Sequence, residues 1–99
     1  MIGIDITSIN RIKKLYEKFG RKVYERFLNE DEIALIKRPE TAAGFWAAKE
    51  AASKALGTGI GADCSFHDII ISKTVKNAPL ITFSEKVIKN FSIKDASLS

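Results

Sequence analysis

The sequence predicts an α+β domain with a mainly antiparallel sheet, one long central helix and several short helices. Two observations lead to this prediction. Residues 39–57 have the composition of a long alanine-rich helix, and residues 66–72 and 80–83 have the apolar, β-branched character of strands. A turn near residues 76–77 would join these strands as a hairpin. A chain of 99 residues has room for one such domain, which we take as 1–99.

The N-terminal third is expected to begin with a strand and continue in helices. Apolar and polar residues alternate over residues 2–6, which places Asp5 on the face opposite the isoleucines. Thr7 or Ser8 would cap a helix that ends at Gly20. The apolar side chains of this helix recur at helical spacing, at Ile9, Ile12, Leu15 and Phe19. Two short helices are expected near residues 24–28 and 29–36.

The longest helix should begin at Pro39, a residue suited to the first helical position, and stop at Gly57. Seven alanines between them would let neighbouring elements approach closely, so we expect this helix to be central. After the hairpin, Ser84 can cap a short helix, and a last strand begins near Ile93.

Composition indicates an ordinary globular protein, with 45% hydrophobic residues and a mean hydropathy of -0.04. No apolar run approaches the ~20 residues that a membrane-spanning helix needs. The first residues lack the features of a signal peptide, and Cys64 is the single cysteine, so we expect a cytoplasmic protein. One cysteine and one histidine make a zinc site improbable, which leaves magnesium or manganese on carboxylates.

Positive charge is concentrated between residues 11 and 26. This segment has seven basic and two acidic residues, a local charge of +5 in a chain whose net charge is +4. This charge predicts an acidic partner, which can be a nucleic acid, an anionic lipid or an acidic protein. The alternative is a solvated helix that happens to be basic.

Two carboxylates occupy positions at which an acidic residue has no evident structural role. Asp5 falls inside an apolar strand, and Glu50 falls among alanines in the central helix. If strand and helix pack together, the two can hold one magnesium ion and leave its other positions to water and a phosphate. The alternatives are a helix cap for Asp5 and an i,i+4 ion pair with Lys54 for Glu50.

Basic and glycine residues surround Glu50. Lys54, one turn later, is placed to neutralise a phosphate, and Lys49 is its neighbour in sequence. Gly57 opens a glycine-rich loop whose N–H groups can face an anion, although Gly57 is also a good helix C-cap. Three other reactive or aromatic residues are interpreted as structural, namely His67, Cys64 and Trp46.

These features, in this order, resemble the holo-acyl-carrier-protein synthases, small trimeric members of the phosphopantetheinyl transferase superfamily. The resemblance rests on GIDIT at 3–7 with Arg11 behind it, on Arg26-Phe27-Leu28 followed by Glu32, on WAAKEAASKALGTGIG at 46–61 and on FHDIII at 66–71. It covers nearly the whole chain, and it implies the 4'-phosphopantetheinyl transferase fold.

The resemblance implies transfer of 4'-phosphopantetheine from coenzyme A to a serine of an acyl carrier protein, in support of fatty acid biosynthesis. Asp5 and Glu50 would be the Mg2+ ligands, and Lys54 would offset charge on the leaving adenosine bisphosphate. Arg11 and Arg21 would form ion pairs with the acidic helix of the carrier, with Leu15 as an apolar contact. Active sites would lie between subunits of a trimer.

Contacts with coenzyme A are expected from Lys49, Lys54 and Gly57, and from Pro79 near the adenine end. Phe45 stands where many family members have an arginine, so Lys37 or Arg38 would supply the missing charge. The family continues past ASLS at 96–99 with a histidine and a closing strand, which this chain is expected to lack.

Two other hypotheses compete with the enzyme. One is a non-catalytic module that binds an acidic protein through residues 11–26. The other is nucleic-acid binding, favoured by a pI of about 9.3 but without a recognisable recognition motif. Because the resemblance implies an acyl carrier protein as partner, we expect neither a nucleic acid nor a membrane in that role.

Overall fold

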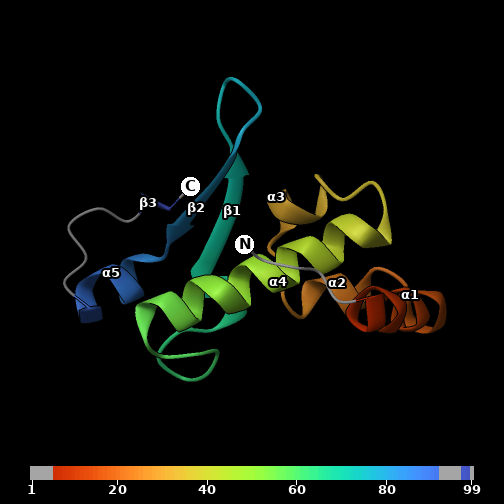
Figure 1. Ribbon diagram of the computed structural model, residues 1–99, viewed down its shortest axis with the longest axis horizontal. Helices are drawn as coiled ribbons and strands as arrows, with labels where there is room; N and C mark the ends of the chain where they lie inside the picture. Colours follow the sequence, from red (N-terminus) through yellow and green to blue (C-terminus); the bar gives the residue numbers. More distant parts are fainter. Residues whose placement is uncertain (1–5, 92–96, 99) are drawn as a thin grey trace.

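The computed structural model of the protein describes residues 6–91, 97 and 98. The elements follow one another as α1 (Ile6–Phe19), α2 (Lys22–Glu25), α3 (Glu30–Ile33), α4 (Pro39–Leu56), the 3-10 helix η1 (Phe66–Asp68), β1 (Ile69–Lys73), β2 (Pro79–Phe83), α5 (Glu85–Phe91) and β3 (Ser97–Leu98). Helix α4 crosses the middle of the molecule, with α1, α2 and α3 toward one end and the sheet and α5 toward the other (Figure 1). The prediction of an α+β fold is confirmed.

The long helix has the predicted ends. Pro39 is at its start, where the missing N–H is not needed, and Gly57 caps its end with a left-handed φ of 94°. Its buried positions include Ala42, Ala43 and Ala52, whose small side chains let other elements approach the backbone closely. The alanine-rich composition therefore produces a central helix, as expected.

The three described strands form one antiparallel sheet in the order β1-β2-β3. In the β1–β2 hairpin, Ile69 pairs with Phe83 and Lys73 with Pro79. The turn contains Asn77 with φ 64°, a conformation that asparagine tolerates better than most residues. Phe66, His67 and Asp68 were predicted to be part of the strand but form η1, because the Asp68 carboxylate accepts a hydrogen bond from the Ser65 N–H and folds the chain into a turn.

The beginning of α1 differs from the prediction. Ile6 is already helical, so Thr7 and Ser8 lie within the helix rather than at its cap. The remainder of the predicted first strand, Asp5 included, and the predicted strand start near Ile93 lie outside the described residues.

The described residues form a core of two hydrophobic clusters. The helical cluster joins α1, α2, α3 and the first half of α4, with Ile12, Phe27, Leu28 and Ile33 among its buried members. The sheet cluster joins the second half of α4 to β1, β2 and α5, through Ala52, Cys64, Ile69, Phe83 and Val87. No helix in the described part of the chain is long and apolar enough to cross a membrane.

Candidate active site and docking surface

Glu50 and Lys54 lie one turn apart on the second half of α4. Glu50 is half-buried and Lys54 is exposed. No ion pair joins them, so the alternative of an i,i+4 salt bridge is wrong. Within the described residues, the Glu50 carboxylate makes neither a hydrogen bond nor an ion pair, and only its backbone carbonyl accepts a bond, from the Ser53 hydroxyl at 2.7 Å. A partly buried carboxylate of this kind is available to a ligand from outside the chain.

The chemistry of Glu50 fits a magnesium ligand. Magnesium is bound by one or two carboxylates together with water and substrate phosphate, rather than by a cage of protein ligands. The described residues contain no group of three or more His, Cys, Asp or Glu side chains that could hold a metal. Asp5, the second predicted ligand, lies outside the described residues, so its part in the site stays a prediction.

Lys49 does not lie where a ligand of coenzyme A would. Its side chain is completely buried, and its ammonium donates to the Phe27 carbonyl at 2.8 Å, to Glu32 Oε1 at 2.8 Å and to the Phe66 carbonyl at 3.0 Å. A lysine has three N–H donors, and all three are used within the chain. The prediction that Lys49 contacts coenzyme A is therefore wrong for this conformation, because neither its charge nor its protons reach the surface.

The glycine-rich loop ends α4 through a set of backbone hydrogen bonds. The Gly57 N–H donates to the Lys54 carbonyl, and the N–H groups of Thr58 and Gly59 both donate to the Ser53 carbonyl. Gly61 donates to the Cys64 carbonyl. These four N–H groups thus have acceptors within the chain, and the contact of Gly57 with coenzyme A stays a prediction. Gly57 is explained by its positive φ at the helix end.

The remaining predicted coenzyme A contacts lie far from Glu50. Lys37 and Arg38 are exposed just before α4. At 1.5 Å per residue they are about 18 Å from Glu50 along the helix axis. Pro79 is exposed at the first position of β2, at the outer end of a hairpin that extends from the body of the molecule (Figure 1). One chain therefore does not bring these residues together with Glu50 and Lys54.

A pocket of about 210 Å³ lies between α1, α2, the middle of α4 and η1. Its walls are mostly apolar and aromatic, with two arginines among them, and its lining residues are Arg11, Ile12, Leu15, Val23, Arg26, Phe27, Trp46 and Phe66. Leu15 is 38% and Phe19 54% exposed, so the apolar stripe of α1 continues from the core onto the surface. An apolar opening beside arginines suits an acidic partner with an apolar side chain to bury.

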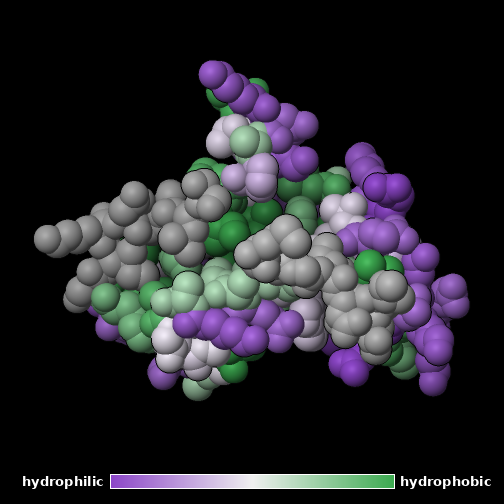
Figure 2. Space-filling view, in the orientation of Figure 1, coloured by the Kyte–Doolittle hydropathy of each residue, from purple (hydrophilic) through white to green (hydrophobic). Residues whose placement is uncertain are grey.

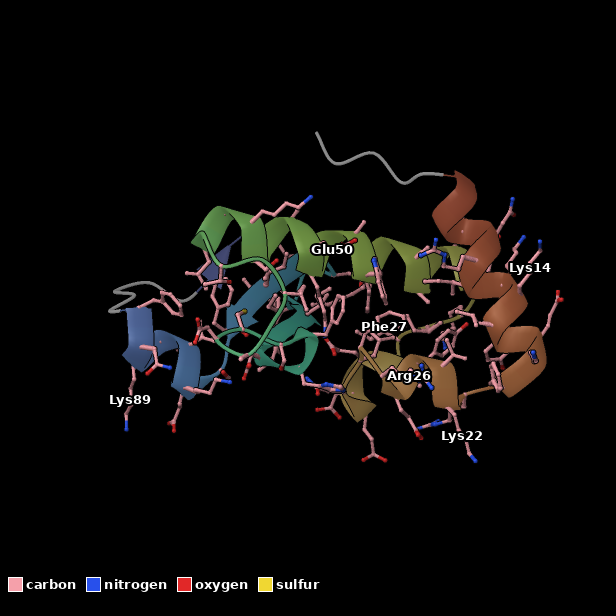
Figure 3. The ribbon with its side chains drawn as sticks, turned by 90° about the horizontal axis from the view of Figure 1, so that it is seen from below. Lys14, Lys22, Arg26, Phe27, Glu50 and Lys89 are labelled. Atoms are coloured by element: carbon pink, nitrogen blue, oxygen red, sulfur yellow. The ribbon has the colours of Figure 1, made fainter. Side chains whose placement is uncertain are left out.

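The basic residues predicted for docking surround this opening. Arg11 and Leu15 both line the pocket, whereas Arg21 is exposed on the neighbouring turn, 4.0 Å from Glu25. Arg26 also lines the pocket, although the sequence placed it only in the basic segment. Figure 2 shows hydrophilic residues gathered over the α1 end of the molecule and at the tip of the hairpin. In Figure 3, Lys14, Lys22 and Arg26 lie at this end of the molecule and Lys89 at the opposite one.

Three residues that the sequence assigned to structural roles have them. The His67 ring nitrogen Nε2 lies 2.8 Å from the Glu25 carbonyl. Cys64 is fully buried, and burial raises the pKa of its thiol. Trp46 packs in the helical cluster, with its ring centroid 5.0 Å from that of Phe27 and 4.5 Å from that of Phe66.

Comparison with known proteins identifies the family. Residues 1–97 match the family described as the 4'-phosphopantetheinyl transferase superfamily. The chain is 68% identical to the holo-acyl-carrier-protein synthase of Aliarcobacter butzleri, over its full length and 84% of that protein. The chain belongs to this family of transferases. It is also 63% identical to the corresponding synthase of Campylobacter curvus, over its full length and 87% of that protein.

Solved structures of the family have the same fold. The holo-acyl-carrier-protein synthase of Helicobacter pylori, crystallised in complex with coenzyme A, is 53% identical with a TM-score of 0.82, over 96% of this chain and 84% of that one. The enzyme from Neisseria meningitidis is 32% identical with a TM-score of 0.73, over 85% of this chain and 70% of that one. The predicted phosphopantetheinyl transferase fold is thus confirmed.

Proposed function

We propose that this chain transfers the 4'-phosphopantetheine group of coenzyme A to a serine of an apo-acyl carrier protein, with Mg2+, and releases adenosine 3',5'-bisphosphate. The observation that carries the proposal is the pair of Glu50 and Lys54 on α4, in a chain of this family. The carboxylate lacks a partner among the described residues, and the lysine one turn later is exposed. The proposed setting is the cytoplasm, with carriers of fatty acid synthesis as acceptors.

In the proposed reaction the serine oxygen attacks the β-phosphorus of coenzyme A, and the bond from that phosphorus to the bridging oxygen breaks. Glu50, with Asp5, would hold Mg2+, which withdraws charge from the phosphoryl oxygens when bound. The Lys54 ammonium is a point charge that can lie against the pyrophosphate and stabilise negative charge developing on the leaving group. Phosphoryl transfer depends largely on such positioning and charge neutralisation.

The carrier would dock on the α1 end of the molecule. Arg11 and Arg21 supply positive charge there, and Leu15 offers an apolar contact at the mouth of the pocket. An acidic helix with one apolar side chain directed into the pocket matches this combination. Charge attraction of this kind speeds association and selects partners more than it adds affinity.

We further propose that the active enzyme is a homotrimer with active sites between subunits. The argument is the separation of the expected coenzyme A contacts within one chain. Lys37, Arg38 and Pro79 lie far from Glu50 along α4 or on the extended hairpin. A neighbouring subunit would bring such residues to the Glu50 site of the first one.

The proposal is tested by incubating the protein with coenzyme A, apo-carrier protein and MgCl2, and by measuring the carrier mass. A gain of one phosphopantetheine group is expected, with adenosine 3',5'-bisphosphate as the second product. Glu50→Gln, which keeps the size of the side chain, should abolish the transfer and leave the circular dichroism spectrum unchanged. Full activity of that variant would refute the metal assignment. Carrier binding without any transfer would instead favour a docking module.

A further inference from the structure

The buried ammonium of Lys49 joins three separate segments. Its acceptors are the Phe27 carbonyl after α2, Glu32 Oε1 in α3 and the Phe66 carbonyl at the start of η1. The Lys49 and Glu32 side chains are exposed by 0% and 1%. Burial lowers the pKa of Lys49, and the Glu32 carboxylate opposes that effect. Lys49 is therefore held from several directions rather than by one ion pair.

Glu32 extends the same cluster into the sheet. Its Oε1 also accepts the Asn29 N–H at 2.6 Å, and its Oε2 accepts the Ile71 N–H of β1 at 2.8 Å. The pair thereby links α4 to α3, to η1 and to β1, between the helical and the sheet clusters. Among the described side chains, no buried nitrogen or oxygen lacks a hydrogen-bond partner.

Helix α4 carries both Lys49 and the proposed site residues Glu50 and Lys54. Most of its buried positions are occupied by alanine or serine, whose short side chains interlock little with neighbouring elements. Trp46 and Leu56 of the same helix pack against the two clusters, and the three hydrogen bonds of buried Lys49 add a directional restraint on rotation of α4 about its own axis. Lys49 reaches across the core and fixes that rotation, and Glu50 follows it by one residue, about 100° around the helix.

We propose that Lys49, held by Glu32, is a positioning residue that sets the rotation of α4 and so directs Glu50 and Lys54 toward the substrate side. This inference rests on the proposed function, in which these two residues hold Mg2+ and phosphate. A buried ion pair is seldom the most stable filling of a core, and apolar residues of similar volume are often as stable or better. Precise placement of the neighbouring carboxylate explains its presence here.

The test separates positioning from stability with three variants. Lys49→Met removes the charge and keeps the length of the side chain. The double variant Lys49→Met/Glu32→Leu removes both charges, so no unpaired carboxylate stays buried. Val87→Ala, in the sheet cluster and outside the hydrogen bonds of Lys49 and Glu32, is a control that destabilises the fold by making a cavity. Each variant is measured for thermal unfolding, for the Mg2+ concentration of half-maximal transfer, and for binding of Mn2+ in the presence of coenzyme A by electron paramagnetic resonance.

Lys49→Met is expected to raise both the half-maximal Mg2+ concentration and the Mn2+ dissociation constant by about ten- to a hundredfold, the usual effect of losing a residue that orients a metal ligand. Compared with Lys49→Met, the double variant should regain part of the lost thermal stability but not the lost affinity for Mn2+ and Mg2+. Val87→Ala should lower the unfolding temperature alone.

Three results would overturn the inference. One is normal Mn2+ binding by folded Lys49→Met, and another is recovery of metal affinity together with stability in the double variant. The third is failure of both Lys49 variants to fold while Val87→Ala folds, which would make the pair purely structural. A wild-type protein that binds Mn2+ but transfers nothing would refute the proposed function and leave the positioning test standing. A wild-type protein that does neither would refute both.

Discussion

The helical and the sheet clusters are stabilised in different ways. The helical cluster is rich in aromatic rings, with the ring centroid of Phe27 6.4 Å from that of Tyr24 and 5.0 Å from that of Trp46, both in edge-on arrangements. The sheet cluster has smaller apolar members and depends on a polar network around Asp68. That carboxylate accepts from the Ser65 N–H and hydroxyl, the Ser84 hydroxyl and the Lys86 ammonium.

This difference in packing corresponds to a difference between the surfaces of the two regions. The aromatic core of the helical region supports a surface on which apolar side chains and arginines lie together, as a docking site requires. The polar network of the sheet region ties η1 to the start of α5, because Ser84 both donates to Asp68 and caps the helix by accepting the Val87 N–H. In the sheet region, packing and hydrogen bonds therefore hold short neighbouring elements together.

The largest expected effect is in the helical cluster. Phe27 is 1% exposed and contacts the rings of Tyr24, Trp46 and Phe66. Phe27→Ala should lower the free energy of unfolding by about 3–5 kcal/mol, because it leaves a cavity among rings that cannot close around it. Urea unfolding followed by Trp46 fluorescence measures the loss. Ile69→Val in the sheet cluster is the comparison, with an expected loss of about 0.5–1.5 kcal/mol. A loss of less than about 1 kcal/mol for Phe27→Ala would contradict the central place of this ring in the helical cluster.

The next effect concerns the polar network of the sheet region. Burial alone would raise the pKa of Asp68, but the hydrogen bonds from Ser65, Ser84 and Lys86 outweigh it and lower the pKa from 3.8 to about 2. Because its pKa is lower in the folded state, the Asp68 carboxylate stabilises the fold at pH values above its unfolded-state pKa. This contribution is lost as the pH falls from about 4 toward 2. Asp68→Asn should therefore cost about 2 kcal/mol at pH 7 and progressively less below pH 4.

Unfolding at a series of pH values checks this expectation. Asp63→Asn, at an exposed carboxylate, is the matched control and should leave stability almost unchanged. A loss for Asp68→Asn that stays constant between pH 7 and pH 2 would show that the lowered pKa does not contribute to stability.

The smallest effect is expected at the docking surface. Arg11→Glu should weaken carrier binding about tenfold by reversing charge beside the pocket, with the KM for coenzyme A unchanged. Lys89→Glu changes the net charge equally at the opposite end of the molecule (Figure 3) and should have little effect. Surface plasmon resonance with immobilised apo-carrier at two salt concentrations distinguishes them, since screening reduces such effects. Equal losses for both variants would mean that net charge, and not this surface, attracts the carrier.

Much of the fold was predictable from local patterns. Pro39 and Gly57 mark the ends of α4, and Ser84 caps α5, because each has a local backbone preference or hydrogen bond. The exception at η1 shows the limit of such patterns. Residues 66–68 precede three isoleucines and share their apolar character in part, but the Asp68 side chain folds back on Ser65 and shortens the strand.

The candidate site was predictable only in part. Glu50 and Lys54 stood out because a helix of alanines gives charged side chains no obvious role, and both remain available in the structure. Lys49 is also a charged residue among the alanines of α4, but its side chain is buried. Nothing local shows which of two adjacent charged residues turns inward, since that depends on Phe27, Glu32 and Phe66, which are 17 to 22 residues away.

The sequence by itself determined the α+β class, the position of the central helix, the basic segment and the presence of Lys49, Glu50 and Lys54 within that helix. These follow from spacing, caps and composition, which act over a few residues. Only the tertiary structure decided that Lys49 is buried, that the loop N–H groups end a helix, and that Arg26 shares a pocket with Arg11. These features arise where segments distant in sequence compete for the same donors, acceptors and space.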